Sequence, residues 1–259
     1  MIEMEEIQGV VREAAKFFTD RAAVGMIREK GPYDYVTAVD EAVQQYMQEK
    51  LAALYPDIQF MGEEKDNSTI DMQGDVWVLD PVDGTTNLVH DYRNSAISLA
   101  LISNREVIFG IIYNPFSDEM YYAKKGNGSF LNGEEIHVSD AKAMEESLIS
   151  IGTSPYFKNE AEENFKIFSL IFRDCQDIRR CGSASLELAH VACGRIDGYM
   201  ENHLKLWDYA AGMLLVREAG GKVLNYEGQE LTMELDGNVV AGNSLIPKII
   251  VEQYLNKKF

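Results

Sequence analysis

An apolar strand that runs straight into acidic residues is the feature that most constrains the fold. The run Val76-Trp-Val-Leu79 is typical of a buried strand, and Asp80-Pro-Val-Asp-Gly-Thr-Thr-Asn87 follows it without a break. A buried carboxylate is costly unless it is paired or binds a metal. Because Pro81 lacks an amide donor and has a fixed φ, we expect it to end the strand. The backbone then turns, which can bring Asp83 beside the first aspartate, with the Val82 carbonyl oxygen pointing the same way.

Two carboxylates and a carbonyl oxygen predict a metal site made only of hard oxygen ligands. Such a site suits Mg²⁺ and disfavours soft metals. The following Gly84 allows close approach of the backbone, and free amides at Thr85 and Thr86 would hold a phosphate beside the metal. The structural alternative is a β-turn in which an aspartate caps a helix, since Asp-Gly and Asn are common in turns.

Two further acidic positions follow apolar runs in the same manner. Glu63 and Glu64 come directly after the strand-like run Ile58–Gly62, and a cation would relieve the repulsion between adjacent carboxylates. Asp208 follows Trp207 at the start of an apolar helix. Taken alone, these positions have simpler interpretations, which are a solvated surface pair and an ordinary helix N-cap.

The charge balance excludes some partners without identifying a function. The 259 residues include 42 acidic and 24 basic ones, which gives a net charge of −18. Binding to nucleic-acid polymers or anionic membranes needs clustered Lys and Arg, so we expect neither partner. No run approaches the roughly 18 apolar residues that span a bilayer, and the start lacks signal-peptide regions. The spacing of the three cysteines fits neither a zinc site nor a disulfide framework. A cytoplasmic protein is therefore expected.

Secondary-structure patterns divide the chain into two halves. Residues 1–142 begin with two helical segments and continue with short strands joined by tight turns, which indicates an antiparallel sheet. Residues 143–259 alternate between strand-like and helical stretches, which indicates an α/β half. No linker separates the halves, so we expect them to pack as one body. The expected strands cover residues 58–62, 76–80, 97–102, 107–113, 120–124, 128–131, 148–151, 177–181, 198–200, 222–225 and 239–241.

Three separated motifs, in this order, resemble those of the inositol monophosphatase family: Gly62-Glu63-Glu64, Asp80-Pro-Val-Asp-Gly-Thr-Thr-Asn87 and Trp207-Asp208-Tyr-Ala-Ala-Gly212. Further similarity at residues 34–40, 126–133 and 180–201 extends the resemblance over almost the whole chain. This family belongs to the lithium-sensitive, Mg²⁺-dependent phosphatase superfamily, together with fructose-1,6-bisphosphatases. The resemblance implies an α/β (α+β) fold, a layered αβαβα sandwich with an antiparallel N-terminal sheet and a mixed α/β C-terminal half.

The resemblance also implies a centre of two to three Mg²⁺ ions. Glu63, Asp80 and the Val82 carbonyl oxygen would hold the first ion. Asp80, Asp83 and Asp208 would hold the second, and Glu63 would contribute to a loosely bound third.

Catalysis would depend on a water molecule activated in this centre. Thr85, hydrogen-bonded to Asp40, would orient and deprotonate the attacking water, with Glu63 as the third catalytic residue. Glu64 is a further candidate beside the centre, and Lys30 matches a lysine near the third metal.

The substrate contacts implied by the resemblance lie in both halves of the chain. They are Asp83, Gly84, Thr85, Thr86, Gly182, Ser183, Ala184 and Glu201. Glu187 is a further candidate, because it stands where bacterial relatives usually carry aspartate. His203 replaces a glycine in the loop 201–208, so we expect it either to line the pocket or to lie exposed. These departures bear on the choice of substrate and leave the metal site unchanged.

The expected activity is hydrolysis of a small phosphate monoester, inositol 1-phosphate or a related sugar or polyol phosphate. Two cations can activate a water and stabilise the leaving alkoxide, so attack would be in line without a phosphoenzyme. The enzyme alternatives are fructose-1,6-bisphosphatase, NADP(H) phosphatase and 3′-phosphoadenosine phosphatase. A catalytically inactive, metal-binding regulatory protein is the alternative from another class. The resemblance further implies a homodimer.

Overall fold

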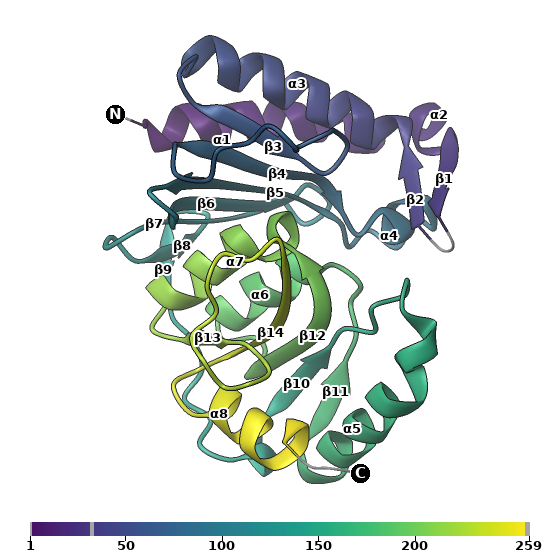
Figure 1. Ribbon diagram of the computed structural model, residues 1–259, viewed down its shortest axis with the longest axis vertical. Coiled ribbons are helices and arrows are strands. Elements are labelled where there is room, and N and C mark those ends of the chain that lie inside the picture. Colours follow the sequence, from purple (N-terminus) through teal and green to yellow (C-terminus); the bar gives the residue numbers. More distant parts are fainter. Residues whose placement is uncertain (1, 32–33, 257–259) are drawn as a thin grey trace.

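The computed structural model describes residues 2–31 and 34–256, and it arranges them in five layers (Figure 1). The layers are a helix pair, a seven-stranded sheet, a second helix pair, a five-stranded sheet and an outer helix layer. The layered αβαβα sandwich and the α/β fold class are therefore confirmed. The helices of the three helical layers are, in this order, α1 (Met4–Ala14) with α3 (Ala38–Leu54), α6 (Ala184–Ala192) with α7 (Leu206–Glu218), and α5 (Ala161–Asp174) with α8 (Ile246–Ile250).

The seven-stranded sheet contains strands of the first half only, and its spatial order follows the chain. One edge pair, β3 with β4, is parallel, and every other pair in the sheet is antiparallel. The strands are β3 (Gln59–Gly62), β4 (Val76–Asp83), β5 (Ala96–Ser103), β6 (Glu106–Asn114), β7 (Glu119–Lys124), β8 (Ser129–Leu131) and β9 (Glu134–Ile136).

The five-stranded sheet contains strands of the second half, in the order β11-β10-β12-β14-β13. Strand β10 pairs in parallel with both of its neighbours, whereas β14 pairs antiparallel with β12 and β13. The sheet is mixed, as expected. The strands are β10 (Leu148–Ile151), β11 (Asp177–Arg179), β12 (Gly198–Lys205), β13 (Lys222–Leu224) and β14 (Asp236–Gly242).

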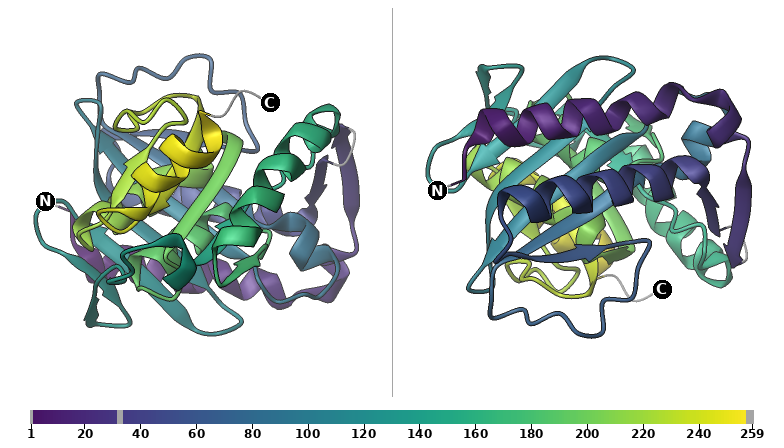
Figure 2. Two further views of the ribbon diagram at one scale, coloured as in Figure 1. Left: turned by 90° about the horizontal axis from the view of Figure 1, so that it is seen from below. Right: turned by 90° about the horizontal axis from the view of Figure 1, so that it is seen from above.

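Apolar patterning explains where each helix lies. On α1, Ile7, Val11 and Ala14 are fully buried on one face, while the other face is solvated, as expected for an outer helix. Helix α7 is apolar on nearly all sides, because it packs against both sheets. Seen from above in Figure 2, α1 and α3 run side by side across the seven-stranded sheet.

Strand β4 differs from the expectation at Pro81. The proline does not end the strand, which continues to Asp83. Asp80 pairs with Ser98 and Asp83 with Ala96, so β4 has one extra residue between these pairs, a β-bulge. A bulge leaves a residue outside the ladder, and proline is tolerated there because no amide donor is needed.

A β-hairpin near the N-terminus was not expected from the sequence. Strands β1 (Ile27–Gly31) and β2 (Asp34–Thr37) pair antiparallel where the sequence indicated only a break at Gly31-Pro32. Strands β9 and the C-terminal part of β12 are also additions to the expected set. The remaining short elements are η1 (Ala15–Thr19), α2 (Arg21–Val24), α4 (Thr85–Val89), η2 (Met144–Glu146), η3 (Lys158–Glu160) and η4 (Val251–Leu255).

Three wider expectations concern membrane spans, the cysteines and the division into halves. None of the helices in the described part of the chain has the length and apolar character that a membrane crossing requires. Cys175, Cys181 and Cys193 are free thiols. All strands of the seven-stranded sheet lie before residue 142 and all strands of the five-stranded sheet lie after it. That residues 1–142 and 143–259 form two units with different roles in the site stays a prediction.

Candidate active site

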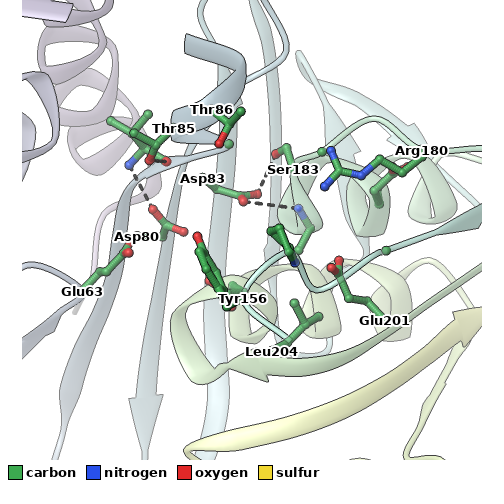
Figure 3. Close-up of a pocket in the computed structure, with 18 of the residues that line it drawn as sticks. Glu63, Asp80, Asp83, Thr85, Thr86, Tyr156, Arg180, Ser183, Glu201 and Leu204 are labelled. Carbon is green, nitrogen blue, oxygen red and sulfur yellow. Dashed lines mark hydrogen bonds between the residues drawn. The ribbon is translucent and has the colours of Figure 1, made fainter. Parts of the chain in front are cut away.

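Most of the site residues named from the sequence surround one pocket at the C-terminal end of β4 (Figure 3). The N-terminal ends of α4, α6 and α7 reach the same pocket, so segments far apart in the sequence meet there. The sequence-named residues that line it are Glu63, Asp80, Val82, Asp83, Gly84, Thr85, Thr86, Gly182, Ser183, Ala184, Glu187, Glu201 and Asp208.

The bulge in β4 places a carboxylate and a carbonyl oxygen at the pocket. Asp80 is only 2% exposed, and its Oδ1 atom accepts a hydrogen bond from the Val82 N–H at 3.0 Å. The Val82 carbonyl oxygen accepts a hydrogen bond from the Thr85 hydroxyl, also at 3.0 Å. The turn that follows the strand is thus fixed by its own backbone and side chains.

Thr85 also donates to Asp40, a residue that lies 45 positions earlier in the sequence. The distance from Thr85 Oγ1 to Asp40 Oδ1 is 3.0 Å. The other carboxylate oxygen of Asp40 accepts from the Thr37 N–H at 2.8 Å and from the Thr37 hydroxyl at 2.6 Å, which caps α3. Burial raises the pKa of Asp40, and the hydrogen bonds from Thr37 oppose this shift.

Gly84 is required for this turn. Its φ of +88° lies in the left-handed region, and a Cβ atom would lie 3.1 Å from the carbonyl oxygens of both Asn94 and Gly182. The glycine therefore lets the segments that carry Thr85 and Gly182 approach each other closely.

Asp83 connects β4 to the start of α6 in the second half. Its carboxylate accepts hydrogen bonds from the Ser183 hydroxyl at 2.6 Å, the Ser185 N–H at 2.7 Å and the Ser185 hydroxyl. The Ala184 N–H donates to its other oxygen at 3.3 Å. A negative charge is favourable at a helix N-terminus, and here it draws the Gly182–Ala184 segment towards β4.

The acidic residues of this pocket repel one another. Burial raises the pKa of Asp80 well above its ordinary value, and the charges of Glu63 and Asp83 raise it further. Burial likewise raises the pKa of Asp208, with added repulsion from Asp83 and Glu63. A bound cation would remove this repulsion, so the cluster favours a divalent metal.

The donor set fits a hard cation, but the side chains hold other partners. Carboxylate and carbonyl oxygens are the ligands that Mg²⁺ prefers. The Asp83 carboxylate turns towards α6, and Asp208 Oδ2 accepts from the Lys205 N–H at 2.7 Å. As they stand, no three Asp, Glu, His or Cys side chains in the described residues converge closely enough to hold a metal. Metal binding would therefore require some of these carboxylates to turn.

The opposite wall of the pocket is formed by β12, the start of α6 and the loop after β10. Glu201 Oε1 accepts from the Ser154 N–H at 3.0 Å, and Glu201 Oε2 accepts from the Tyr199 hydroxyl at 2.6 Å. Burial raises the pKa of Glu201, whereas the nearby Arg180 lowers it. In Figure 3, Tyr156, Arg180 and Glu201 face the acidic residues of β4 across the pocket.

Four residues named from the sequence do not line this pocket. Asp40 lies behind Thr85, and the Glu64 N–H donates to Gln44 Oε1 at 2.9 Å outside it. His203 stacks on Phe157, and neither of them lines the pocket. The Lys30 backbone lies in β1, and its side chain lies outside the described part of the structure.

The sequence did not identify several residues of the wall. Tyr35, Ile151, Gly152, Pro155, Tyr156, Arg180 and Leu204 also line the pocket. Arg180 directly precedes the Cys-Gly-Ser-Ala motif, which was the available signal for its position. The loop that carries Pro155 and Tyr156 has no comparable motif, because only tertiary packing brings it to the site.

Comparison with known proteins defines the class of this protein. The family model described as "Inositol monophosphatase family" matches residues 3–257. The chain is 39% identical to the inositol-1-monophosphatase of Rhizobium meliloti (strain 1021), covering 86% of this chain and 84% of that protein. It is 38% identical to the Nus factor SuhB of Xylella fastidiosa (strain Temecula1), and the match covers 78% of this chain and 73% of that protein. A phosphatase is the class that this family supports.

The fold gives the same result. The solved structure of the Thermotoga maritima IMPase superposes with a TM-score of 0.86 at 32% identity, covering 98% of this chain and 97% of that one. The chain belongs to the inositol monophosphatase family. Enzymes of this family are generally metal-dependent and act on small phosphorylated substrates.

Proposed function

We propose that the protein hydrolyses a small phosphate monoester, inositol 1-phosphate or a related sugar or polyol phosphate, with Mg²⁺ as cofactor. The observation that supports this most strongly is the group of acids at the end of β4. Burial raises the pKa of both Asp80 and Asp208 there, and the charge of Asp83 raises both further, beside the hydrogen-bonded pair Thr85–Asp40. Hard oxygen ligands next to a positioned hydroxyl suit metal-assisted hydrolysis.

The acidic residues would hold the metal ions. Glu63, Asp80 and the Val82 carbonyl oxygen are the ligands proposed for one Mg²⁺, and Asp80, Asp83 and Asp208 for the second. A third ion would bind loosely near Glu63. When bound, such ions lower the pKa of a coordinated water and stabilise the leaving oxygen.

Thr85 and Asp40 would move the proton of the attacking water. The Thr85 hydroxyl has acceptors at 3.0 Å in both Asp40 Oδ1 and the Val82 carbonyl oxygen. A hydroxyl both donates and accepts, so Thr85 can accept a proton from water while it donates its own to Asp40. Burial raises the pKa of Asp40, which makes its carboxylate a stronger proton acceptor, as a general base requires.

The remaining contacts would bind the two ends of the substrate. Gly84, Thr85 and Thr86 would hold the phosphate, and Asp83, Gly182, Ser183, Ala184 and Glu201 would hold the alcohol. Fructose-1,6-bisphosphatase, NADP(H) phosphatase and 3′-phosphoadenosine phosphatase activities differ from this proposal only in the alcohol group. A catalytically inactive metal-binding protein would keep the ligands and lack turnover.

One assay separates these functions. Phosphate release is measured across phosphorylated polyols, sugars and nucleotides, each with Mg²⁺, without it and with added Li⁺. We expect Mg²⁺-dependent, Li⁺-inhibited turnover that is fastest on a polyol or sugar monophosphate. Fastest turnover on a bisphosphate or nucleotide would select an enzyme alternative, and no Mg²⁺-dependent turnover would exclude all of the enzyme functions.

Two further parts of the proposal concern the state of the protein. A homodimer is proposed from the family resemblance. A cytoplasmic location is proposed from the number and spacing of the cysteines.

A further inference from the structure

One buried carboxylate oxygen in the pocket has no hydrogen-bond partner. Across the described residues, three buried side-chain atoms lack one: Trp77 Nε1, Ser129 Oγ and Glu187 Oε2. Of these three residues, Glu187 alone lines the pocket, and it is only 2% exposed. Buried polar atoms are almost always paired, so an open carboxylate oxygen at a pocket indicates a missing partner.

The rest of the Glu187 side chain is fixed in place. Its Oε1 atom accepts from the Cys181 N–H at 2.7 Å, and the Cys181 carbonyl oxygen accepts from Asn87 Nδ2 at 2.8 Å and from Asn94 Nδ2 at 3.2 Å. If Glu187 rotated away, the Cys181 N–H would lose its acceptor. The Ser150 hydroxyl and the Cys181 thiol are both near enough to favour ionised Glu187, but neither forms a hydrogen bond with its Oε2 atom. The Ser150 hydroxyl donates instead to the Arg179 carbonyl oxygen at 3.1 Å.

Glu201 on the same wall differs from Glu187 in this respect. Both Glu201 oxygens already accept protein hydrogen bonds, one from the Ser154 N–H and one from the Tyr199 hydroxyl. Glu187 has one oxygen committed and one open. The wall therefore offers its free hydrogen-bonding position at Glu187.

The charges around this position indicate which group it binds. Arg180 is the one cation among the described side chains that line the pocket, and the two carboxylates of Glu187 and Glu201 outnumber it. A second phosphate on the substrate would meet net negative charge here. A neutral hydroxyl can donate a hydrogen bond to an ionised carboxylate oxygen without adding charge to this wall, so it suits Glu187.

We propose that Glu187 Oε2 forms a hydrogen bond with a hydroxyl group of the substrate alcohol, which makes Glu187 a specificity-determining residue. This inference rests on the proposed phosphatase function and deepens it. It predicts that the enzyme prefers alcohols with a hydroxyl beyond the ester position, and that Glu187 is responsible for part of that preference.

The test compares two substrates in the full-length protein with Mg²⁺. Inositol 1-phosphate carries ring hydroxyls, and cyclohexyl phosphate has the same ring without them. In Glu187→Gln, the amide oxygen can still accept from Cys181 N–H, which leaves an NH₂ group at the open position. We expect kcat/KM for inositol 1-phosphate to fall about 10- to 100-fold, and that for cyclohexyl phosphate to change less than about threefold.

A matched control distinguishes this effect from a structural one. Asn94→Ala removes a hydrogen bond to the Cys181 carbonyl oxygen and leaves the open oxygen of Glu187 unchanged. We expect it to affect both substrates equally, with the urea midpoint of each variant checking the fold. An equal loss on both substrates in Glu187→Gln would overturn the proposal, as would unchanged rates, which would mean that water fills the position. If the wild-type protein hydrolyses neither compound nor any other phosphate monoester, the proposed function itself fails.

Discussion

The two walls of the pocket are built in different ways. The wall at the end of β4 comes from the contiguous run Asp80–Thr86, fixed by a bulge and by the hydrogen bonds of Thr85. The opposite wall is assembled from separate segments that contribute Tyr156, Arg180 and Glu201. The first wall comes from one contiguous segment and carries the proposed chemistry, whereas the second comes from several segments and would determine the alcohol. Variants of the first should therefore affect turnover, and variants of the second should affect specificity and wall stability.

Asp83→Asn should have the largest effect, because Asp83 belongs to both walls. The substitution removes a charge proposed to bind Mg²⁺ while keeping an oxygen that can accept from Ser183 and Ser185. We expect kcat to fall by at least about 100-fold with the fold retained. Initial rates measure the fall in kcat, and urea unfolding shows whether the fold is retained. Near-full turnover would contradict the proposed metal role of Asp83.

Thr85→Ala tests the chemistry of the first wall without changing its charge. Loss of the hydroxyl removes the connection to Asp40, and we expect kcat to fall about 100-fold, the typical size of a general acid–base contribution. Thr85→Ser keeps the hydroxyl and is the matched control, expected within about fivefold of the wild type. If both variants lose activity to the same extent, the methyl group matters and the proton-transfer role is wrong.

His190 lies on α6, the helix whose start belongs to the second wall, and it predicts a pH dependence of stability. Burial and Arg195 lower its pKa to about 4 from 6.5. Between these values the unfolded chain binds more protons than the folded protein, so stability decreases as the pH falls below 6.5. The expected loss attributable to His190 between pH 8 and pH 5 is about 2 kcal/mol.

The measurement is urea unfolding of His190→Gln and of the wild type at both pH values. Between pH 8 and pH 5, the free energy of unfolding of His190→Gln should fall by about 2 kcal/mol less than that of the wild type. The control is His137→Gln, at an exposed histidine, which should behave like the wild type. Equal losses in the wild type and in His190→Gln would contradict the assignment.

His203→Ala should produce the smallest effect and tests the packing of the second wall. The His203 ring stacks on Phe157 with centroids 3.8 Å apart, and its Nε2 lies 2.9 Å from Glu160. Loss of the stacking and of this partly exposed hydrogen bond should lower the free energy of unfolding by about 1 kcal/mol. Hydrogen exchange should accelerate in residues 152–160, while Thr85 chemistry, measured as kcat, stays unchanged.

Glu163→Ala at an exposed site of α5 is the control for this variant, with an expected change within about 0.5 kcal/mol. If His203→Ala leaves both stability and hydrogen exchange unchanged, His203 does not support the wall.

The sequence predicted the first wall better than the second because its information is local. A buried strand followed by acids, proline and glycine identified Asp80, Asp83 and Gly84 without any knowledge of distant segments. The same reasoning was wrong about Pro81, since a bulge can contain a proline inside a strand. Glu63 and Asp208 line the same pocket, but separately each had a simpler interpretation, and their order along the chain became informative only through the family resemblance.

The second wall could not be predicted because its members have no shared pattern. Tyr156 reaches the pocket through a loop that Glu201 and Asn202 hold in place, and these contacts exist only in the folded chain. The pairing of β1 with β2 was missed for a similar reason. Gly31-Pro32 indicated a break, and two short, mostly polar strands give little apolar alternation.

The proposed metal centre is tested most directly by measuring whether the acids of the first wall bind Mg²⁺. Calorimetric titration of Mg²⁺ into the wild type, with inorganic phosphate present, should show saturable binding of at least two ions per chain, the number proposed above. Asp80→Asn, which alters a ligand proposed for both ions, should lose this binding while its urea midpoint shows a folded protein. Absence of saturable binding in the wild type, or equal binding in a folded Asp80→Asn variant, would contradict the proposed Mg²⁺ centre at the end of β4.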